Sequence, residues 1–126
     1  MYEVGVVTQF EASHALRGDF GPATRMHGHT YRLEAVVQGD TLQESGVLFD
    51  ITLLQAELDR LTADLHYRDL NTVAGLEQVN TTAEAMAHFC WDRLAPALHG
   101  QGLAQLTVRV WENPQAWAAR HDALTP

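Results

Sequence analysis

Lysine is absent from this sequence, and cysteine occurs only once. The absence of lysine excludes chemistry that needs a lysine amine, such as Schiff-base formation. The single Cys90 cannot form a disulfide within the chain. All eight basic residues are arginines, and they face 16 acidic residues, which gives a net charge of −8 at pH 7. Because the sequence has no basic run, we expect no binding to nucleic acid or to an anionic membrane.

Long hydrophobic runs are also missing. No segment approaches the roughly 18 consecutive apolar residues that a membrane-spanning helix needs. The N-terminal residues lack a basic region followed by an apolar segment, so no secretory signal is expected and the expected location is cytoplasmic. The chain has 126 residues, of which 46% are hydrophobic. With no linker or internal repeat, this composition predicts one folded domain over residues 1–126.

Two long strands are predicted in the first third of the chain. Residues 1–14 are rich in β-branched side chains and alternate between polar and apolar types. Residues 26–38 form the second strand, in which His27, His29 and Tyr31 share one face. A last strand over residues 106–112 has Glu112 on its apolar face.

Two helices are predicted between the second and the last strand. Apolar residues recur at helical spacing from Ile51 to Leu65, with Asp50 as the N-cap. Thr81 and Glu84 fit a capping box that opens a second helix, which we expect to continue to about Leu94 before Pro96 ends it. The order of elements predicts an α+β fold with an antiparallel sheet and helices on one face.

The sharpest chemical feature is His27-Gly28-His29. Residues two apart on a strand place both imidazoles on one face, about 7 Å apart. If the first two strands form an antiparallel hairpin, His14 lies at a comparable height. Three imidazoles that leave one coordination position open are the pattern of a catalytic zinc site. The alternative is that these are ordinary histidines without a metal.

Two further groups have a functional and a structural interpretation. Glu112 can recognise a pair of N–H groups on a heterocycle, or it can be an exposed strand end. His66 and Tyr67, which follow the first helix, are capable proton donors. Alternatively, His66 lies at a polar helix terminus, where the helix dipole favours it.

The combination of motifs resembles the 6-pyruvoyltetrahydropterin synthase family, which includes the bacterial 6-carboxytetrahydropterin synthases of queuosine biosynthesis. The resemblance spans nearly the whole chain. It is carried by Phe10-Glu11-Ala12-Ser13-His14, His27-Gly28-His29-Thr30-Tyr31, Gly46-Val47-Leu48-Phe49-Asp50, Leu70-Asn71, Asn80-Thr81-Thr82-Ala83-Glu84 and Glu112.

The resemblance implies a tunnelling fold, with a four-stranded antiparallel sheet and two helices on one face. It implies that subunits join their sheets into a trimeric barrel, that trimers can stack as hexamers, and that sites form between subunits. It further implies that His14, His27 and His29 bind zinc. Glu112 would anchor a pterin ring, with Thr81 and Thr82 near the same pocket.

The sequence departs from the family pattern at the residues that move protons. Ala23 stands where the family has a cysteine, and His66 and Tyr67 stand where it has an adjacent Asp-His pair. A shift in the alignment restores the histidine role to His66, with Asp64 or Asp69 as its partner. The candidate catalytic residues are His66, Tyr67 and Asp69, while zinc-bound hydroxide and Asp19 in the loop before His27 remain alternative bases.

The resemblance implies a zinc-dependent lyase that acts on dihydroneopterin triphosphate or a related dihydropterin. Two alternatives remain. The first is a non-catalytic paralog that binds a pterin or purine and keeps the metal site. The second is a different zinc-assisted reaction on another heterocycle.

Overall fold

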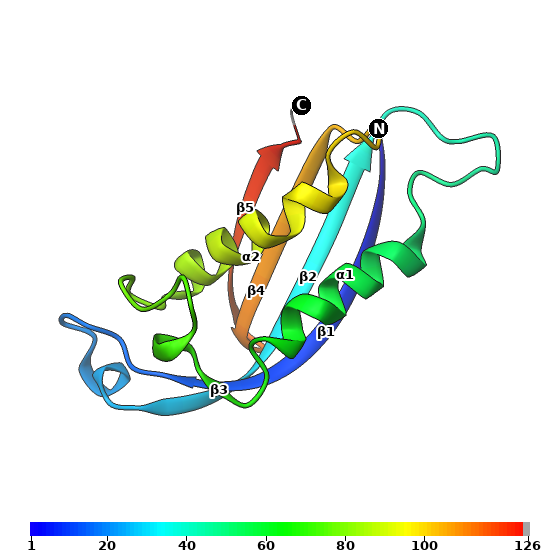
Figure 1. Ribbon diagram of the computed structural model, residues 1–126. Coiled ribbons are helices and arrows are strands. Elements are labelled where there is room, and N and C mark those ends of the chain that lie inside the picture. The colour runs from blue at the N-terminus through cyan, green and yellow to red at the C-terminus, as the bar shows by residue number, and fades with distance from the viewer. Residues whose placement is uncertain (125–126) are drawn as a thin grey trace.

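The computed structural model describes residues 1–124, which form a sheet covered by two helices on one face (Figure 1). The sheet has five strands in the order β3-β1-β2-β4-β5. The strands are β1 (Tyr2–His14), β2 (His27–Gly39), β3 (Arg68–Asp69), β4 (Gln105–Asn113) and β5 (Ala116–Ala123), and the helices are α1 (Ile51–Ala63) and α2 (Ala83–Leu98).

The α+β fold class is confirmed, but the number of strands differs from the expected four. The two-residue β3 pairs in parallel with β1, so the sheet is mixed. The other neighbouring strands pair antiparallel. β5 follows β4 through a tight hairpin, which the sequence analysis did not predict.

The first helix begins as expected, because the Asp50 side chain accepts a hydrogen bond from the Thr52 backbone N–H at 2.8 Å. Leu54, Leu58 and Leu61 are buried against the sheet. Ile51 was placed on the same apolar stripe, but it is 57% exposed. It lies in the first turn of the helix, beside the 40–50 connection rather than over the sheet.

The second helix differs from the prediction at both ends. Its N-cap is Thr82, not Thr81, and the Thr82 hydroxyl accepts a hydrogen bond from the Ala85 backbone N–H at 3.1 Å. Pro96 lies inside the helix, which continues to Leu98. Pro96 is exposed in the last turn, whereas Ala95 and Leu98 are buried, so packing outweighs the one hydrogen bond that proline removes.

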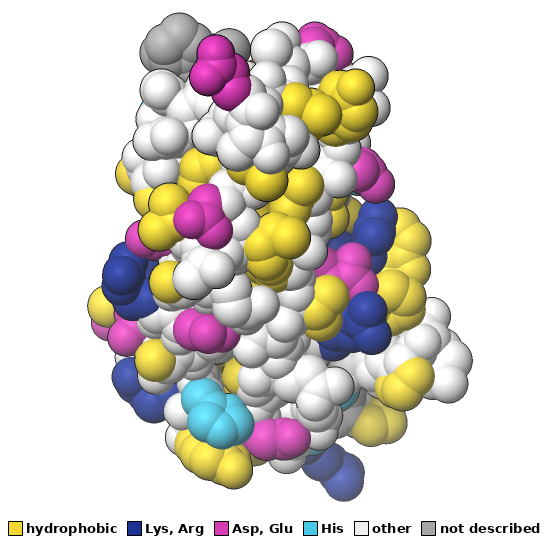
Figure 2. All heavy atoms as spheres, turned by 90° about the vertical axis from the view of Figure 1, so that its right-hand side faces the viewer, with side chains coloured by type: hydrophobic (Ala, Val, Ile, Leu, Met, Phe, Trp, Pro, Cys, Tyr) yellow, Lys and Arg dark blue, Asp and Glu magenta, His cyan; other side chains and the backbone are white. Residues whose placement is uncertain are grey.

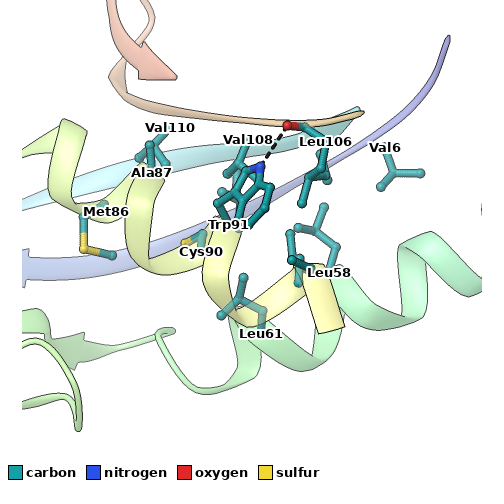
Figure 3. Packing of buried hydrophobic residues seen from close by; sticks show 14 of the residues in the cluster. Val6, Leu58, Leu61, Met86, Ala87, Cys90, Trp91, Leu106, Val108 and Val110 are labelled. Carbon is teal, nitrogen blue, oxygen red and sulfur yellow. Dashed lines mark hydrogen bonds between the residues drawn. The ribbon is translucent and has the colours of Figure 1, made fainter. Parts of the chain in front are cut away.

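The core lies between the helices and the sheet. Trp91 in α2 packs over β4, and its indole N–H donates a hydrogen bond to the Leu106 carbonyl at 2.8 Å (Figure 3). Cys90 is fully buried in the same layer, and burial raises the pKa of its thiol to about 12. A buried thiol with a raised pKa is an inert part of the core rather than a nucleophile.

No helix among residues 1–124 is long and apolar enough to cross a membrane.

Candidate metal centre and ligand site

The three histidines predicted as metal ligands meet at one end of the sheet. β1 and β2 pair so that His14 lies opposite His27 and Ala12 lies opposite His29. All three side chains point to the face that carries the helices. One ligand atom from each histidine lies within 4.8 Å of those of the other two. This geometry comes from the antiparallel register, which places the end of β1 beside the start of β2.

Hydrogen bonds orient two of these imidazoles. His14 Nδ1 lies 2.8 Å from the Thr81 carbonyl oxygen, and His27 Nδ1 lies 2.7 Å from the Arg25 carbonyl oxygen. A carbonyl can only accept, so each Nδ1 carries the proton and each Nε2 keeps its lone pair. A backbone carbonyl that accepts from Nδ1 in this way is typical of histidines that bind a metal through Nε2.

The inner nitrogens of the cluster fit a metal ion. His14 Nε2 and His29 Nε2 are buried, and neither has a hydrogen-bond partner within residues 1–124. Burial also lowers the pKa of His14 and of His29, so both imidazoles are neutral at pH 7. Neutral, desolvated imidazoles with free lone pairs are the donor set that Zn²⁺ prefers, and no fourth protein ligand closes the group in the described chain.

Glu112 lies near this cluster because it directly follows Trp111, which pairs with Arg32 of β2, and so comes level with Tyr31. The β4–β5 register shifts between Trp111 and Asn113, which leaves Glu112 without a paired residue on β5. Such a bulge redirects a side chain at the end of a strand. The charge of Glu112 raises the pKa of both His14 and His29, in opposition to the larger effect of burial. The carboxylate therefore shares the face and the end of the sheet with the three histidines.

A buried phenol lies next to the same group. The Tyr31 ring stacks on Phe10 with centroids 4.9 Å apart, and its centroid lies 5.3 Å from that of His29. Burial, and after it the charge of Glu112, raises the pKa of Tyr31 well above its usual range. The sequence analysis placed Tyr31 on the face of His27 and His29, but it gave the residue no role.

The two predicted threonines have different places. Thr81 is fully buried, and its hydroxyl oxygen lies 3.2 Å from His14 Nδ1 in addition to the contact of its carbonyl. Thr82 caps α2. Thr81 therefore lies behind a histidine, and Thr82 begins the helix beside it.

The three candidate catalytic residues lie on the segment after α1, along the edge of β1, and are not part of the histidine group itself. His66 Nδ1 accepts a hydrogen bond from the Glu11 backbone N–H at 3.0 Å, and its ring packs on Tyr67 with centroids 3.8 Å apart. Tyr67 has a φ of 58° and is 78% exposed. The Asp69 carboxylate accepts a hydrogen bond from the Asn71 backbone N–H at 3.0 Å. Tyr67 and Asp69 line a hollow of about 440 Å³ together with Gly28 and His29, so this hollow reaches one residue of the histidine cluster.

The loop between β1 and β2 contains no cysteine, and Ala23 occupies the position where the resemblance led us to look for one. Ala23 is held near the start of this loop, because its carbonyl accepts a hydrogen bond from the Leu16 backbone N–H at 2.9 Å. The hydroxyl of the neighbouring Thr24 donates to the Gly21 carbonyl at 2.7 Å. Neither residue offers a free acid or base to the histidine cluster.

Comparisons with known proteins agree on one family. Residues 3–122 match the model of the family described as 6-pyruvoyl tetrahydropterin synthase. The 6-carboxy-5,6,7,8-tetrahydropterin synthase of Haemophilus influenzae is 26% identical over 140 residues, which cover 93% of this chain and 96% of the relative. The dihydroneopterin monophosphate aldolase of Pyrococcus furiosus is 31% identical over 103 residues, which cover 82% of each chain.

A solved structure supports the fold. The 6-pyruvoyl tetrahydropterin synthase of Caenorhabditis elegans superposes with a TM-score of 0.83 and 20% identity, and covers 96% of this chain and 95% of its own. At this identity the likeness shows the fold alone, which is the tunnelling fold.

Proposed function

Because the chain belongs to the 6-pyruvoyl tetrahydropterin synthase family, we propose that it is a zinc-dependent lyase that acts on a phosphorylated dihydropterin, with dihydroneopterin triphosphate as the first substrate to test. The observation that carries the proposal is the convergence of His14, His27 and His29, of which His14 and His29 have buried Nε2 atoms without a hydrogen-bond partner among residues 1–124. Zinc held there supplies a Lewis acid that polarises an oxygen of the substrate side chain.

Glu112 orients the ring of the substrate. A carboxylate accepts two parallel N–H bonds, which matches the amidine-like edge of a pterin. The pairing of β4 with β2 brings Glu112 to the end of the sheet where the histidines lie, and its charge acts on His14 and His29. In this arrangement the ring is held at Glu112 and the side chain of the substrate extends toward the metal. Thr81 keeps His14 in the required tautomer, and Thr82 begins α2 next to the pocket.

Three arginines near the same end of the sheet favour a phosphorylated substrate. Arg17 and Arg25 belong to the loop between β1 and β2, and Arg68 lies in β3. All three are exposed, and none takes part in an ion pair within residues 1–124, whereas the other five arginines of the chain all do. In a protein with a net charge of −8, unpaired cations gathered at one end attract an anionic ligand to that end.

The proton-transfer groups come from the segment after α1. Tyr67 is the exposed phenol of this segment, and the His66 ring packs against it. The hydrogen bond from the Glu11 backbone N–H uses Nδ1 of His66 and leaves Nε2 for proton transfer. Since Tyr67 is exposed and lies along Glu11 at the open edge of β1, we infer that the two residues serve a site that this edge forms with a neighbouring copy. Asp69 then supports this segment through its hydrogen bond to Asn71.

The edges of the sheet support assembly into a trimeric or hexameric barrel. β3 covers only Ala12 and Ser13 of β1, and β5 forms the opposite edge. Hydrophobic side chains run down the middle of the face shown in Figure 2. The exposed hydrophobic residues next to the start of β1 are Met1, Tyr2, Leu42, Val47, Ile51 and Leu53. An open strand edge beside exposed apolar surface is suited to pairing with another subunit.

The decisive experiment incubates zinc-loaded protein with dihydroneopterin triphosphate and, separately, with dihydroneopterin. Mass spectrometry follows the loss of substrate and the formation of product. The proposal expects turnover of the phosphorylated compound by the wild-type protein and none by His29→Ala. Unchanged substrate in every reaction would contradict catalysis.

A second candidate function is a pterin-binding protein without activity, and it is favoured by Ala23 in place of a cysteine. Calorimetry with the same two compounds distinguishes the candidates. Binding without turnover supports the second candidate, whereas turnover eliminates it.

The phosphate preference has its own test. Replacing Arg17, Arg25 and Arg68 with Gln should weaken binding of dihydroneopterin triphosphate while binding of dihydroneopterin stays unchanged. Arg60→Gln is the matched control, because Arg60 is exposed but is paired with Glu57 on α1. Equal losses for both compounds would show that the three arginines do not recognise phosphate.

A further inference from the structure

One asparagine holds the backbone directly after the buried histidine. The Asn71 side-chain oxygen accepts a hydrogen bond from the Ala15 backbone N–H at 2.8 Å, and its amide N–H donates to the Ala15 carbonyl at 3.2 Å. The two bonds together reproduce what a neighbouring strand provides. They continue the ladder in which β3 pairs with Ala12 and Ser13. Asn71 therefore fixes the chain at the position that follows His14.

The same amide group also reaches the residue behind the imidazole. Asn71 Nδ2 lies 3.5 Å from the Thr81 hydroxyl, and that hydroxyl lies 3.2 Å from His14 Nδ1. His14 is thus held from two directions, through its own backbone and through Thr81. Asn71 touches both supports, and its backbone N–H is in turn held by the Asp69 carboxylate.

A second asparagine, Asn80, makes a similar pair of hydrogen bonds to the backbone of Arg17, two residues after Ala15. The Asn80 side-chain oxygen accepts from the Arg17 backbone N–H at 2.8 Å, and its amide donates to the Arg17 carbonyl at 2.9 Å. The Asn80 side chain has no hydrogen bond to Thr81 or to His14 within the described residues. Two asparagines of the described chain thus hold the backbone after His14 by the same pair of hydrogen bonds, and of the two only Asn71 also contacts a residue that touches His14.

We propose that Asn71 is a positioning residue for the metal centre, which acts by holding His14 in the orientation and tautomer that direct Nε2 toward the other two imidazoles. The inference rests on the proposed zinc site and assigns a function to a residue that does not itself bind metal. Partners that orient a ligating histidine typically change metal affinity 10- to 100-fold when they are lost.

The test compares Asn71→Asp with Asn80→Asp in the full-length protein. Each substitution keeps the size of the side chain and the oxygen that accepts from the backbone, but removes the N–H that donates. Each also adds one negative charge, which by itself attracts Zn²⁺. We expect Asn71→Asp to weaken zinc binding 10- to 100-fold in chelator competition, in spite of this charge. Asn80→Asp should stay within about threefold of the wild type.

Two further measurements separate positioning from a general loss of structure. Urea unfolding of the metal-free variants should give similar stabilities, because each loses one amide-to-backbone hydrogen bond and Asn71 loses in addition only the 3.5 Å contact with Thr81. Co²⁺ substitution should show a changed d–d absorption spectrum for Asn71→Asp and the wild-type spectrum for Asn80→Asp. If Asn71→Asp does not fold, Thr81→Val removes the hydroxyl that joins Asn71 to His14, and we expect the same loss of zinc affinity.

The outcomes distinguish this inference from the proposed function. If the wild-type protein binds zinc and both Asn71→Asp and Thr81→Val bind it within threefold, Asn71 does not position the site. Equal losses in Asn71→Asp and Asn80→Asp would also overturn the inference. If the wild-type protein takes up no zinc, the proposed function fails first and the positioning role fails with it.

Discussion

Replacing Glu112 with glutamine tests whether this carboxylate binds the ring of the pterin. The substitution keeps the shape of the side chain and removes its charge. Glu112 lies on the bulge of β4, partly exposed, at the end of the sheet that carries the histidines. If its carboxylate accepts two N–H bonds from a pterin, the amide accepts at most one of them and places its own N–H groups against the ligand.

The expected magnitude follows from the strength of a hydrogen bond to a charged group. Such a bond contributes about 1.5–3 kcal/mol, which corresponds to a roughly 10- to 150-fold weaker affinity. Isothermal titration calorimetry with dihydroneopterin on zinc-loaded protein measures this change. Zinc content should remain at one ion per chain, because the three imidazoles are unchanged.

Glu11→Gln is the matched control. Glu11 is also partly buried and lies near the same end of the sheet, but it faces the side without helices, where both carboxylate oxygens accept from the Thr30 hydroxyl at 2.9 and 2.8 Å. Its replacement should leave pterin affinity within about twofold. Unchanged affinity in Glu112→Gln, or an equal loss in Glu11→Gln, would refute the assignment of Glu112 as the anchor.

Three further predictions concern the metal and the core. His29→Ala should abolish stoichiometric zinc, as measured by atomic emission on dialysed protein, because two imidazoles rarely suffice; a full complement of zinc would contradict the ligand set. In metal-free protein, burial lowers the pKa of His14 and of His29. As the pH falls, the two histidines are therefore protonated in the unfolded chain before they are protonated in the folded one. The free energy of unfolding should be constant above pH 6.5 and should decrease below pH 6.5, by at most about 1.4 kcal/mol per pH unit for each histidine. Urea unfolding at pH 7.5 and 5.5 checks this, and equal stabilities would speak against it. Trp91→Phe should lower the free energy of unfolding by about 2–4 kcal/mol, because it leaves the buried Leu106 carbonyl without its 2.8 Å partner. A loss below about 0.5 kcal/mol in urea denaturation would show that this hydrogen bond contributes little.

The sequence by itself determined the features that depend on local periodicity. Alternation along the predicted strand 26–38 placed His27, His29 and Tyr31 on one face, and the structure shows all three directed to the helix side of β2. The stripe of leucines similarly identified the buried face of α1. A side chain's face follows from its position in the strand or helix, so these features need no knowledge of distant contacts.

Helix ends and turns were less well determined. Thr81 and Thr82 both carry a hydroxyl that can cap the start of α2, and only the packing decides which of them does so. Thr81 contacts His14 Nδ1 through its carbonyl oxygen, and the N-cap of α2 is Thr82. Pro96 stays helical because the buried Leu98 extends the contact with the sheet.

The tertiary structure alone decided how distant segments meet at the site. The β2–β4 register that brings Glu112 level with Tyr31, the two-residue pairing of β3 with β1, and the contact of Asn71 with Ala15 each join residues that the period of one element cannot relate. The same holds for His66 and Tyr67, which a sequence motif places near a catalytic site but which the fold exposes on the far side of β1 from β2. Local patterns specify which face of an element a residue occupies, whereas the register between elements and the path of their connections are set by long-range packing.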